Sequence, residues 1–358
     1  MDIAFGKMNI PGQTAKPGSA KTQPQDCAGR GNQQANDHQE FSELVHLSEL
    51  NMQRLPMKIE NSPNLACSEN ESSYIKRVDQ TLLTHDPLAV ASEVQNLYQS
   101  IFPGAGHFFV PQTFGWAIDC FTGYFEDYQP VDTRYHDFEH TLQGTLCMAR
   151  ILDGRHRAGA KPALTQKYFE LGLLAILLHD TGYLKKQDDT QGTGAKYTAT
   201  HVNRSMEFAA RLLTKKKFTG EDIWAVQNMI RCTGVDAVLT AIPFQSELEE
   251  VTGLALGAAD LVGQMAAEDY IEKLPALYAE FAEAAASGKS QARYFGGFSS
   301  AEDLISKTPL FWKKHVREKL DREFAGMHLF LNNPYPDGPN FYLNRIEANI
   351  QKLGGRLG

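Results

Sequence analysis

The sequence contains few cysteines and no long apolar run, and each absence excludes a class of protein. The five cysteines among 358 residues are an odd number, and none has the close spacing of a zinc site. This usage favours a reducing compartment over a secreted, disulfide-bonded domain. No apolar segment reaches the roughly 18 residues of a membrane-spanning helix, and the start Met-Asp-Ile lacks the basic and apolar plan of a signal peptide. We therefore expect a cytoplasmic protein with no membrane partner.

Basic residues are also in the minority. The chain has 35 Lys and Arg against 43 Asp and Glu, a formal net charge of -8. A negatively charged chain is repelled by nucleic acids and by anionic membranes, so neither is expected as the main partner. A GxxxxGK[ST] phosphate loop and a GxSxG nucleophile elbow are both absent. P-loop nucleotide hydrolases and the commonest serine hydrolases are therefore not supported.

The first 73 residues differ in composition from the rest of the chain. Gln, Asn, Ser, Gly and Pro dominate residues 11–36, and residues 60–73 are again polar. Such a segment cannot bury enough apolar surface to offset the entropy lost on folding. We predict a disordered arm over 1–73. A short amphipathic stretch, 41–55, offers a docking segment, although the composition favours a mobile tail without that task.

From residue 74 onward, helical patterning dominates. Apolar residues recur three and four positions apart, with Gly and Pro at the joints and almost no alternating strand pattern. The predicted helices are 90–102, 113–128, 139–152, 166–178, 200–213, 221–230, 246–265 and 270–285, followed by 301–315, 316–331 and 341–353. The sequence therefore predicts one all-α domain over 74–358, built from about a dozen helices.

Several ionisable residues interrupt this apolar pattern. In chain order they are His136, His140, His179, Asp180 and Asp260. The two histidines of the first element lie one helical turn apart and share a face. The His-Asp pair ends the apolar run 171–178, and the last aspartate follows the small and apolar residues 254–259. A buried carboxylate is costly unless a cation or hydrogen bonds compensate it. The set predicts a metal centre of imidazole and carboxylate ligands, suited to Zn, Mn, Fe or Mg.

Each of these residues has an ordinary structural interpretation. Taken singly, His136 or Asp260 would more often be a hydrogen-bonded core residue than a ligand. His-Asp pairs also occur by chance, and His85-Asp86, which precedes Pro87, is interpreted as a helix cap. Only the ordered combination of several such positions, each at an apolar helix boundary, favours the metal centre.

At these residues the chain resembles the HD-domain superfamily of metal-dependent phosphohydrolases and, within it, the cyclic-nucleotide phosphodiesterases. The phosphodiesterase pattern is Tyr-His-Asn-x-x-His, then an apolar helix ending in His-Asp, then a distant Asp preceded by Ala. Here Tyr135-His136 begins the first motif, and Asp137 stands where the family usually has Asn. The resemblance covers most of residues 90–285. It implies a phosphodiesterase-like multi-helix bundle around a dinuclear metal site.

The resemblance also implies a role for each matched residue. His140, His179, Asp180 and Asp260 would hold one divalent metal, with Asp180 bridging to a second. His136 would be the general acid that protonates the leaving oxygen. A two-metal site of this kind activates a water and clamps phosphoryl oxygens. The expected substrate is a small-molecule phosphoester, most favourably a nucleotide.

The chain departs from the family pattern in two places. The phosphodiesterases usually have a further His within a few residues of the His-Asp pair, whereas the next His here is His201. We keep two alternatives for it, a ligand of the second metal or the phosphate, and a helix-start cap. The family's purine-binding Gln has a weak candidate in Gln291, which follows Asp260 more closely than the family spacing.

Three functions fit these observations. The first is a phosphodiesterase that hydrolyses a (cyclic) nucleotide with a metal-activated water. The second is an HD-type nucleotide phosphomonoesterase that uses the same metals, and the third is a signalling module that binds a metal or ligand without turnover. Because every ligand position is intact, we favour an enzyme over the binding module.

Overall fold

The computed structural model describes residues 84–234, 237–287 and 297–355, all of which belong to the unit Arg54–Gly358. The predicted arm 1–73, with its amphipathic stretch 41–55, lies outside the described residues. Gln291 does so as well. In the described part of the chain, no helix is both long and apolar enough to cross a bilayer.

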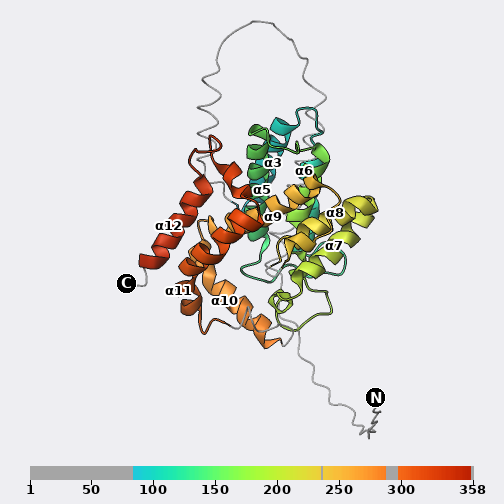
Figure 1. Cartoon of the computed structure of the whole chain (residues 1–358). Coiled ribbons are helices and arrows are strands. Elements are labelled where there is room, and N and C mark those ends of the chain that lie inside the picture. The colour runs from blue at the N-terminus through green and yellow to red at the C-terminus, as the bar shows by residue number, and fades with distance from the viewer. Residues whose placement is uncertain (1–83, 235–236, 288–296, 356–358) are drawn as a thin grey trace, which may run out of the picture. The chain divides into compact units, whose positions relative to one another are not determined.

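The described residues form ten α-helices and no β-strand, only isolated bridges, which confirms the all-α prediction (Figure 1). The helices are α3 (Pro87–Ile101), α4 (Phe109–Phe121), α5 (Phe138–Arg157), α6 (Gln166–Leu178), α7 (His201–Lys215), α8 (Gly220–Arg231), α9 (Glu247–Met265), α10 (Tyr270–Ala286), α11 (Ala301–Phe311) and α12 (Phe341–Gly355). Short 3₁₀ and π turns join several of them.

Side-chain caps begin many of these helices, as the sequence signals predict. Asp86 caps α3 by accepting hydrogen bonds from the backbone N–H groups of Leu88 and Ala89, and Pro87 occupies the first turn. The interpretation of His85-Asp86 as a cap is therefore confirmed. Asp137 caps α5 in the same way, through the backbone N–H of His140 at 2.9 Å. This cap fixes the first turn of the helix that carries His140.

Glycines allow α5 and α9 to pack closely along one another. A Cβ at Gly263 would lie 2.7 Å from the backbone oxygen of Gln143, a separation that no substituted residue tolerates. The second close approach lies beside Asp260, three residues before Gly263 on α9. A Cβ built at Gly144 of α5 would lie 3.7 Å from the Cα of Asp260. Backbone contact at both points brings the His140 turn of α5 beside the Asp260 turn of α9. The small residues of α9 therefore position the site.

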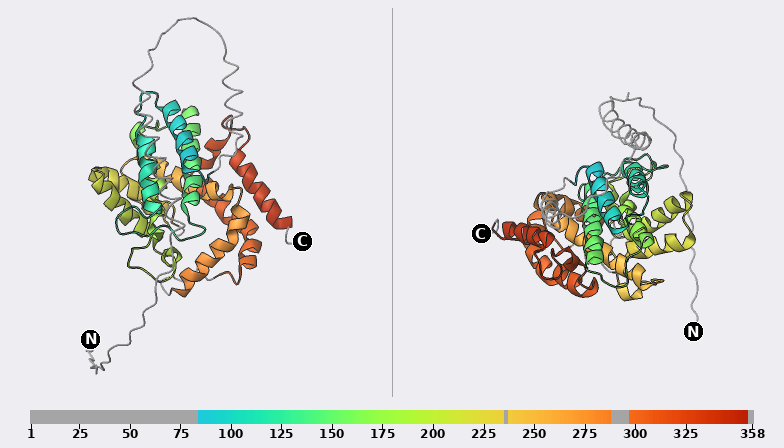
Figure 2. Two further views of the ribbon diagram at one scale, coloured as in Figure 1. Left: turned by 180° about the vertical axis from the view of Figure 1, so that it is seen from behind. Right: turned by 90° about the horizontal axis from the view of Figure 1, so that it is seen from above.

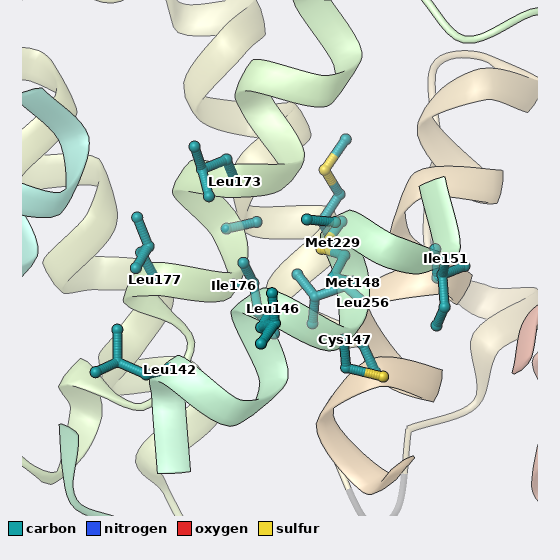
Figure 3. Close-up of a cluster of buried hydrophobic side chains, with 14 of the residues drawn as sticks. Leu142, Leu146, Cys147, Met148, Ile151, Leu173, Ile176, Leu177, Met229 and Leu256 are labelled. Atoms are coloured by element: carbon teal, nitrogen blue, oxygen red, sulfur yellow. The ribbon is translucent and has the colours of Figure 1, made fainter. Parts of the chain in front are cut away.

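An apolar cluster holds α5 and α9 against their neighbours. Figure 3 shows side chains of four helices meeting in it. They are Leu142, Leu146, Cys147, Met148 and Ile151 of α5, Leu173, Ile176 and Leu177 of α6, Met229 of α8 and Leu256 of α9. All are at most 4% exposed, and burial of each large aliphatic side chain contributes about 1.5–3 kcal/mol. This rigid core fixes the ends of the helices on which the ionisable residues lie.

The remaining helices surround this centre. Helix α7 packs against α8, and α8 contacts both α6 and α9. On the other side, α10 contacts α11, α11 contacts α12, and α12 returns to α9 (Figures 1 and 2). Helix α10 thus begins close to the C-terminal end of α9, from which only a short turn separates it.

Two predicted helices have other boundaries in the structure. The predicted helix 113–128 ends at Phe121, because Gly123 has φ +81° and a Cβ there would lie 2.7 Å from Pro130. The prediction of one helix over 316–331 is wrong. A π turn and a 3₁₀ turn occupy that stretch, and Ala325 and Gly326, at φ +49° and +70°, separate them. An apolar period alone does not reveal these left-handed residues.

Candidate metal centre

Four side chains from three separate parts of the sequence converge on one point. The Nε2 atom of His140 lies 3.2 Å from both Oδ2 of Asp180 and Oδ1 of Asp260. The Nε2 atom of His179 lies 3.3 and 3.5 Å from the same two oxygens. We call these four residues the ligand cluster. Ligand atoms around a metal at about 2.0–2.2 Å are themselves separated by roughly 3.0–3.5 Å. The fold thus brings two nitrogens and two oxygens together at the spacing of atoms that bind one metal ion.

Four buried atoms of the ligand cluster lack a hydrogen bond of good geometry among the described residues, and one of them is Nδ1 of His140. The other three, Nε2 of His179, Oδ2 of Asp180 and Oδ1 of Asp260, belong to the atoms that converge at 3.2–3.5 Å. A buried polar atom without a partner costs about 1–3 kcal/mol or more when charged. Because the three atoms face the same point, one cation satisfies them together. The residues present therefore fit a divalent metal, and His140, His179 and Asp180 form a group whose ligand atoms all lie within 4.8 Å of one another.

Local structure orients the imidazole of His179. This residue caps the C-terminal end of α6, and its Nδ1 lies 2.7 Å from the backbone oxygen of Ile176. A backbone carbonyl can only accept, so Nδ1 carries the proton and Nε2 keeps its lone pair for a metal. Asp180 follows directly, at the start of the 3₁₀ turn η1 (Thr181–Tyr183). The end of α6 therefore presents both ligands to the same side.

Tight packing sets the turn after Asp180 against the start of α7. A Cβ at Gly182 would lie 2.0 Å from the backbone oxygen of His201, so only glycine fits. The backbone N–H of Gly182 donates to Ser205 Oγ at 2.8 Å, and Arg204 Nε donates to the Gly182 carbonyl at 2.7 Å. This glycine follows the His-Asp pair by two residues and brings His201 to the site.

His201 faces the Asp180 carboxylate oxygen that His140 and His179 do not face. Its Nδ1 lies 2.6 Å from the carbonyl of Thr198, and its Nε2 lies 3.9 Å from Oδ1 of Asp180. The other oxygen of Asp180 faces His140 and His179. The two oxygens of one carboxylate are thus directed at different imidazoles, as a bridging ligand requires. The helix-start position itself is held by Thr200.

His136 lies at the edge of the site and is held by an acidic partner. Its Nδ1 lies 2.6 Å from Oε2 of Glu280, a buried residue of α10. The other oxygen of Glu280 accepts hydrogen bonds from the backbone N–H groups of Arg134 and Tyr135, at 2.7 and 2.6 Å. The carboxylate therefore fixes both the ring and the backbone before it. His136 makes no close contact with either aspartate of the ligand cluster.

Aromatic stacking links His136 to His201. The ring of Tyr183 stacks on His136 at a centroid distance of 4.6 Å and on His201 at 4.7 Å, each with an interplanar angle of 18°. We call His136, Tyr183, His201 and Glu280 the edge cluster. Tyr183 and Glu280 were not predicted from the sequence. The sequence does carry a signal that Glu280 is buried, because this residue lies among apolar residues at helical spacing in α10. In the structure, its side chain is 5% exposed.

Opposite charges govern protonation in the ligand cluster. Burial lowers the pKa of His140, but its hydrogen bonds with Asp180 and Asp260 outweigh burial and raise the pKa to about 9. The pKa of His179 is raised well above its usual range for the same reasons. Burial raises the pKa of Asp180 and of Asp260, yet the adjacent imidazoles hold both values below the usual range. Without a metal, the cluster is an internally neutralised set of charges.

The pKa values of His201 and Glu280, in the edge cluster, are both lowered. Burial is the main cause that lowers the pKa of His201, so its Nε2 keeps a lone pair near neutral pH. Burial raises the pKa of Glu280, but the hydrogen bond and charge of His136, with the two backbone donors, lower it overall.

Asp137, the position that differs from the phosphodiesterase pattern, caps α5 and pairs with Lys273 at 3.1 Å. It therefore stays outside the ligand cluster.

Comparison with known proteins finds a family whose model matches part of the chain. Residues 187–331 are similar to the family model described as Npun_R2479-like. This segment is less than half of the chain and contains His201, Asp260 and Glu280, whereas His140 and His179 precede it. No curated protein matches the sequence. The family description names no activity, so the chemistry is argued from the site itself.

Proposed function

We propose that this protein is a metal-dependent phosphohydrolase and that its preferred substrate is a nucleotide phosphodiester, such as a cyclic nucleotide. One observation carries the proposal. Buried imidazole and carboxylate atoms converge without other partners, and a carboxylate-held His136 lies beside them with its ring centroid 5.4 Å from that of His140. The resemblance to the HD-domain phosphodiesterases at the same residues supplies the phosphorus substrate.

The ligand cluster would hold one divalent ion, through His140, His179, Asp180 and Asp260. Oδ1 of Asp180 and Nε2 of His201 would share in holding a second. When bound, such ions lower the pKa of a water and neutralise charge on phosphoryl oxygens. The mixed nitrogen and oxygen donors suit Zn, Mn or Fe, and the carboxylate oxygens are also compatible with Mg.

His136 performs the proton transfer in this scheme. Its Nδ1–H donates to Glu280, which fixes the ring so that Nε2 can deliver a proton. Water loses one proton to solvent and attacks phosphorus as the bond to the leaving oxygen breaks. The proton of Nε2 passes to that oxygen, which departs as a neutral hydroxyl, and His136 regains a proton from solvent. Glu280 acts as a positioning residue, because it contacts His136 and not the reacting atoms.

A metal-supplemented activity screen tests the proposal. Purified protein is assayed with Zn, Mn, Fe or Mg against cyclic nucleotides, mononucleotides, dinucleotides, and aryl phosphate mono- and diesters. We expect the protein to hydrolyse diesters. Asp180→Asn should abolish this activity, and the control Asp188→Asn, at an exposed aspartate, should retain it. Hydrolysis confined to monoesters would favour the phosphomonoesterase. Tight metal binding with no hydrolysis of any phosphoester would contradict an enzymatic role.

A further inference from the structure

A cavity of about 380 Å³ lies between α5, the C-terminal end of α9 and the first turn of α12. One face of α5 lines it, at positions spaced as 139, 143, 146 and 150. Its volume is within the range that holds a small molecule. No residue of the ligand cluster or the edge cluster belongs to its lining. The cavity is therefore a separate feature of the domain.

Two arginines face this cavity, and among the described residues neither donates a hydrogen bond to a carboxylate. Arg150 donates from Nη1 to the hydroxyl of Tyr342 at 3.1 Å, and Glu93 is 4.0 Å from its Nη2. Arg345 donates from Nε to the backbone carbonyl of Ala266 at 2.8 Å, and no carboxylate among the described residues pairs with it. Tyr342 and Arg345 lie one turn apart on α12 and share a face. Two guanidinium groups are thus available to the same space.

The lining also contains three acidic residues, which one lysine offsets in part. Lys273 lies 3.3 Å from Glu139 and 3.4 Å from Asp269, and Asp137 shares it at 3.1 Å. Glu268 is exposed, so solvent screens its charge. The two arginines are partly buried, so their attraction for an anion is screened less.

The cavity also contains hydrogen-bond donors that lack acceptors. Gln143 is 6% exposed, and its Nε2 has no partner among the described residues. The same holds for Nη2 of Arg150. Buried donors are normally satisfied, so two unsatisfied donors in one lining indicate a missing acceptor. Amide and guanidinium donors together match the oxygens of a phosphate or carboxylate group.

We infer that this cavity binds a small anion bearing a phosphate or carboxylate group, which Arg150 and Arg345 hold with help from Gln143. The inference does not rest on the proposed hydrolase activity. Arg345 is the better residue to test, because Arg150 is more deeply enclosed between α3, α5 and α12.

Isothermal titration of the full chain with inorganic phosphate and with citrate, at constant ionic strength in chloride, tests the inference. We expect saturable binding of at least one anion, weakened tenfold or more by Arg345→Gln. The matched control Arg322→Gln, at an exposed arginine paired with Glu318, should leave the affinity unchanged. His179→Ala, which disables the ligand cluster, should also retain binding, and this separates the cavity from phosphate held at a metal. The anion that binds more tightly shows whether the cavity prefers a phosphate or a carboxylate group.

Hydrogen exchange gives a second readout that needs no variant. The bound anion should slow exchange of the backbone amides in the first turn of α12. The inference is overturned if neither anion binds more tightly than chloride. It is equally overturned if a folded Arg345→Gln protein binds with wild-type affinity, or if binding leaves the exchange of residues 341–345 unchanged.

Discussion

The ligand cluster and the edge cluster are built from the same kinds of side chain but differ in what their polar atoms contact. In the ligand cluster, buried atoms of His179, Asp180 and Asp260 face a common point and have no hydrogen bond to any other group among the described residues. In the edge cluster, His136 and His201 each bond through Nδ1 and leave Nε2 uncommitted. In the first arrangement, the charged groups are compensated only by one another unless a cation binds. In the second, one ring nitrogen of each histidine lies outside these bonds.

The largest effect is expected from removal of a ligand. His179→Ala or Asp180→Ala should abolish both metal content and hydrolysis, because each leaves the remaining charged atoms of the ligand cluster without a compensating ion. Elemental analysis and an activity assay provide the measurement. His156→Ala, at an exposed histidine on α5, is the control. A full metal complement in either ligand variant would show that the pair does not bind the ion.

A smaller effect, on rate alone, is expected at His136. His136→Ala should retain the metal and lose turnover by roughly 10²- to 10⁴-fold, the range typical of general acid–base groups. Loss of metal in this variant would move His136 from the edge cluster into the ligand cluster.

Glu280→Gln sharpens the test of His136. Because Glu280 contacts the ring and not the reacting atoms, we expect a decrease of about 10- to 100-fold in turnover with metal retained. The alkaline limb of the pH–rate profile, where a general acid loses its proton, should also move, which a purely structural role would not cause. Glu207→Gln, at an exposed position of α7, should change neither quantity.

The comparison also predicts a change in stoichiometry at His201. If its Nε2 helps to hold a second ion with Asp180, His201→Ala should reduce the metal content from two ions per chain to one and leave the first ion in place. Titration with Zn or Mn, followed by elemental analysis, measures both. An unchanged stoichiometry would return His201 to a structural role at the start of α7.

The smallest effect concerns pH. In the metal-free protein the pKa of His140 is about 9, so this imidazole is protonated at pH 7. A metal binds only the deprotonated ring and must displace the proton, and the pKa of His179 is raised as well. Affinity should therefore rise with pH through neutrality and up to at least 9, by about tenfold per pH unit for each proton displaced. Calorimetry in buffers of different ionisation enthalpy counts these protons. Zero proton release at pH 7 would contradict the raised pKa.

Local sequence signals alone determined much of the fold. The apolar spacing of 166–178 matches α6 at both ends, and the cap at Asp86 starts α3 as expected, because both depend on residues within one or two turns. The overlong prediction for α4 and the missed break at Ala325 and Gly326 have another origin. Left-handed backbone torsions at Gly123, Ala325 and Gly326, and the close approach of Gly123 to Pro130, end those helices.

The sequence also identified His140, His179, Asp180 and Asp260 as a set, because charged residues at apolar helix ends are visible in one dimension. Only the tertiary structure decided how they meet. The backbone contact of Gly263 with α5 brings two ligands together, and Gly182 against α7 adds His201. Glu280, which lies 144 residues after its partner His136, could not be assigned from spacing. Such pairings depend on helix packing, which no local pattern encodes.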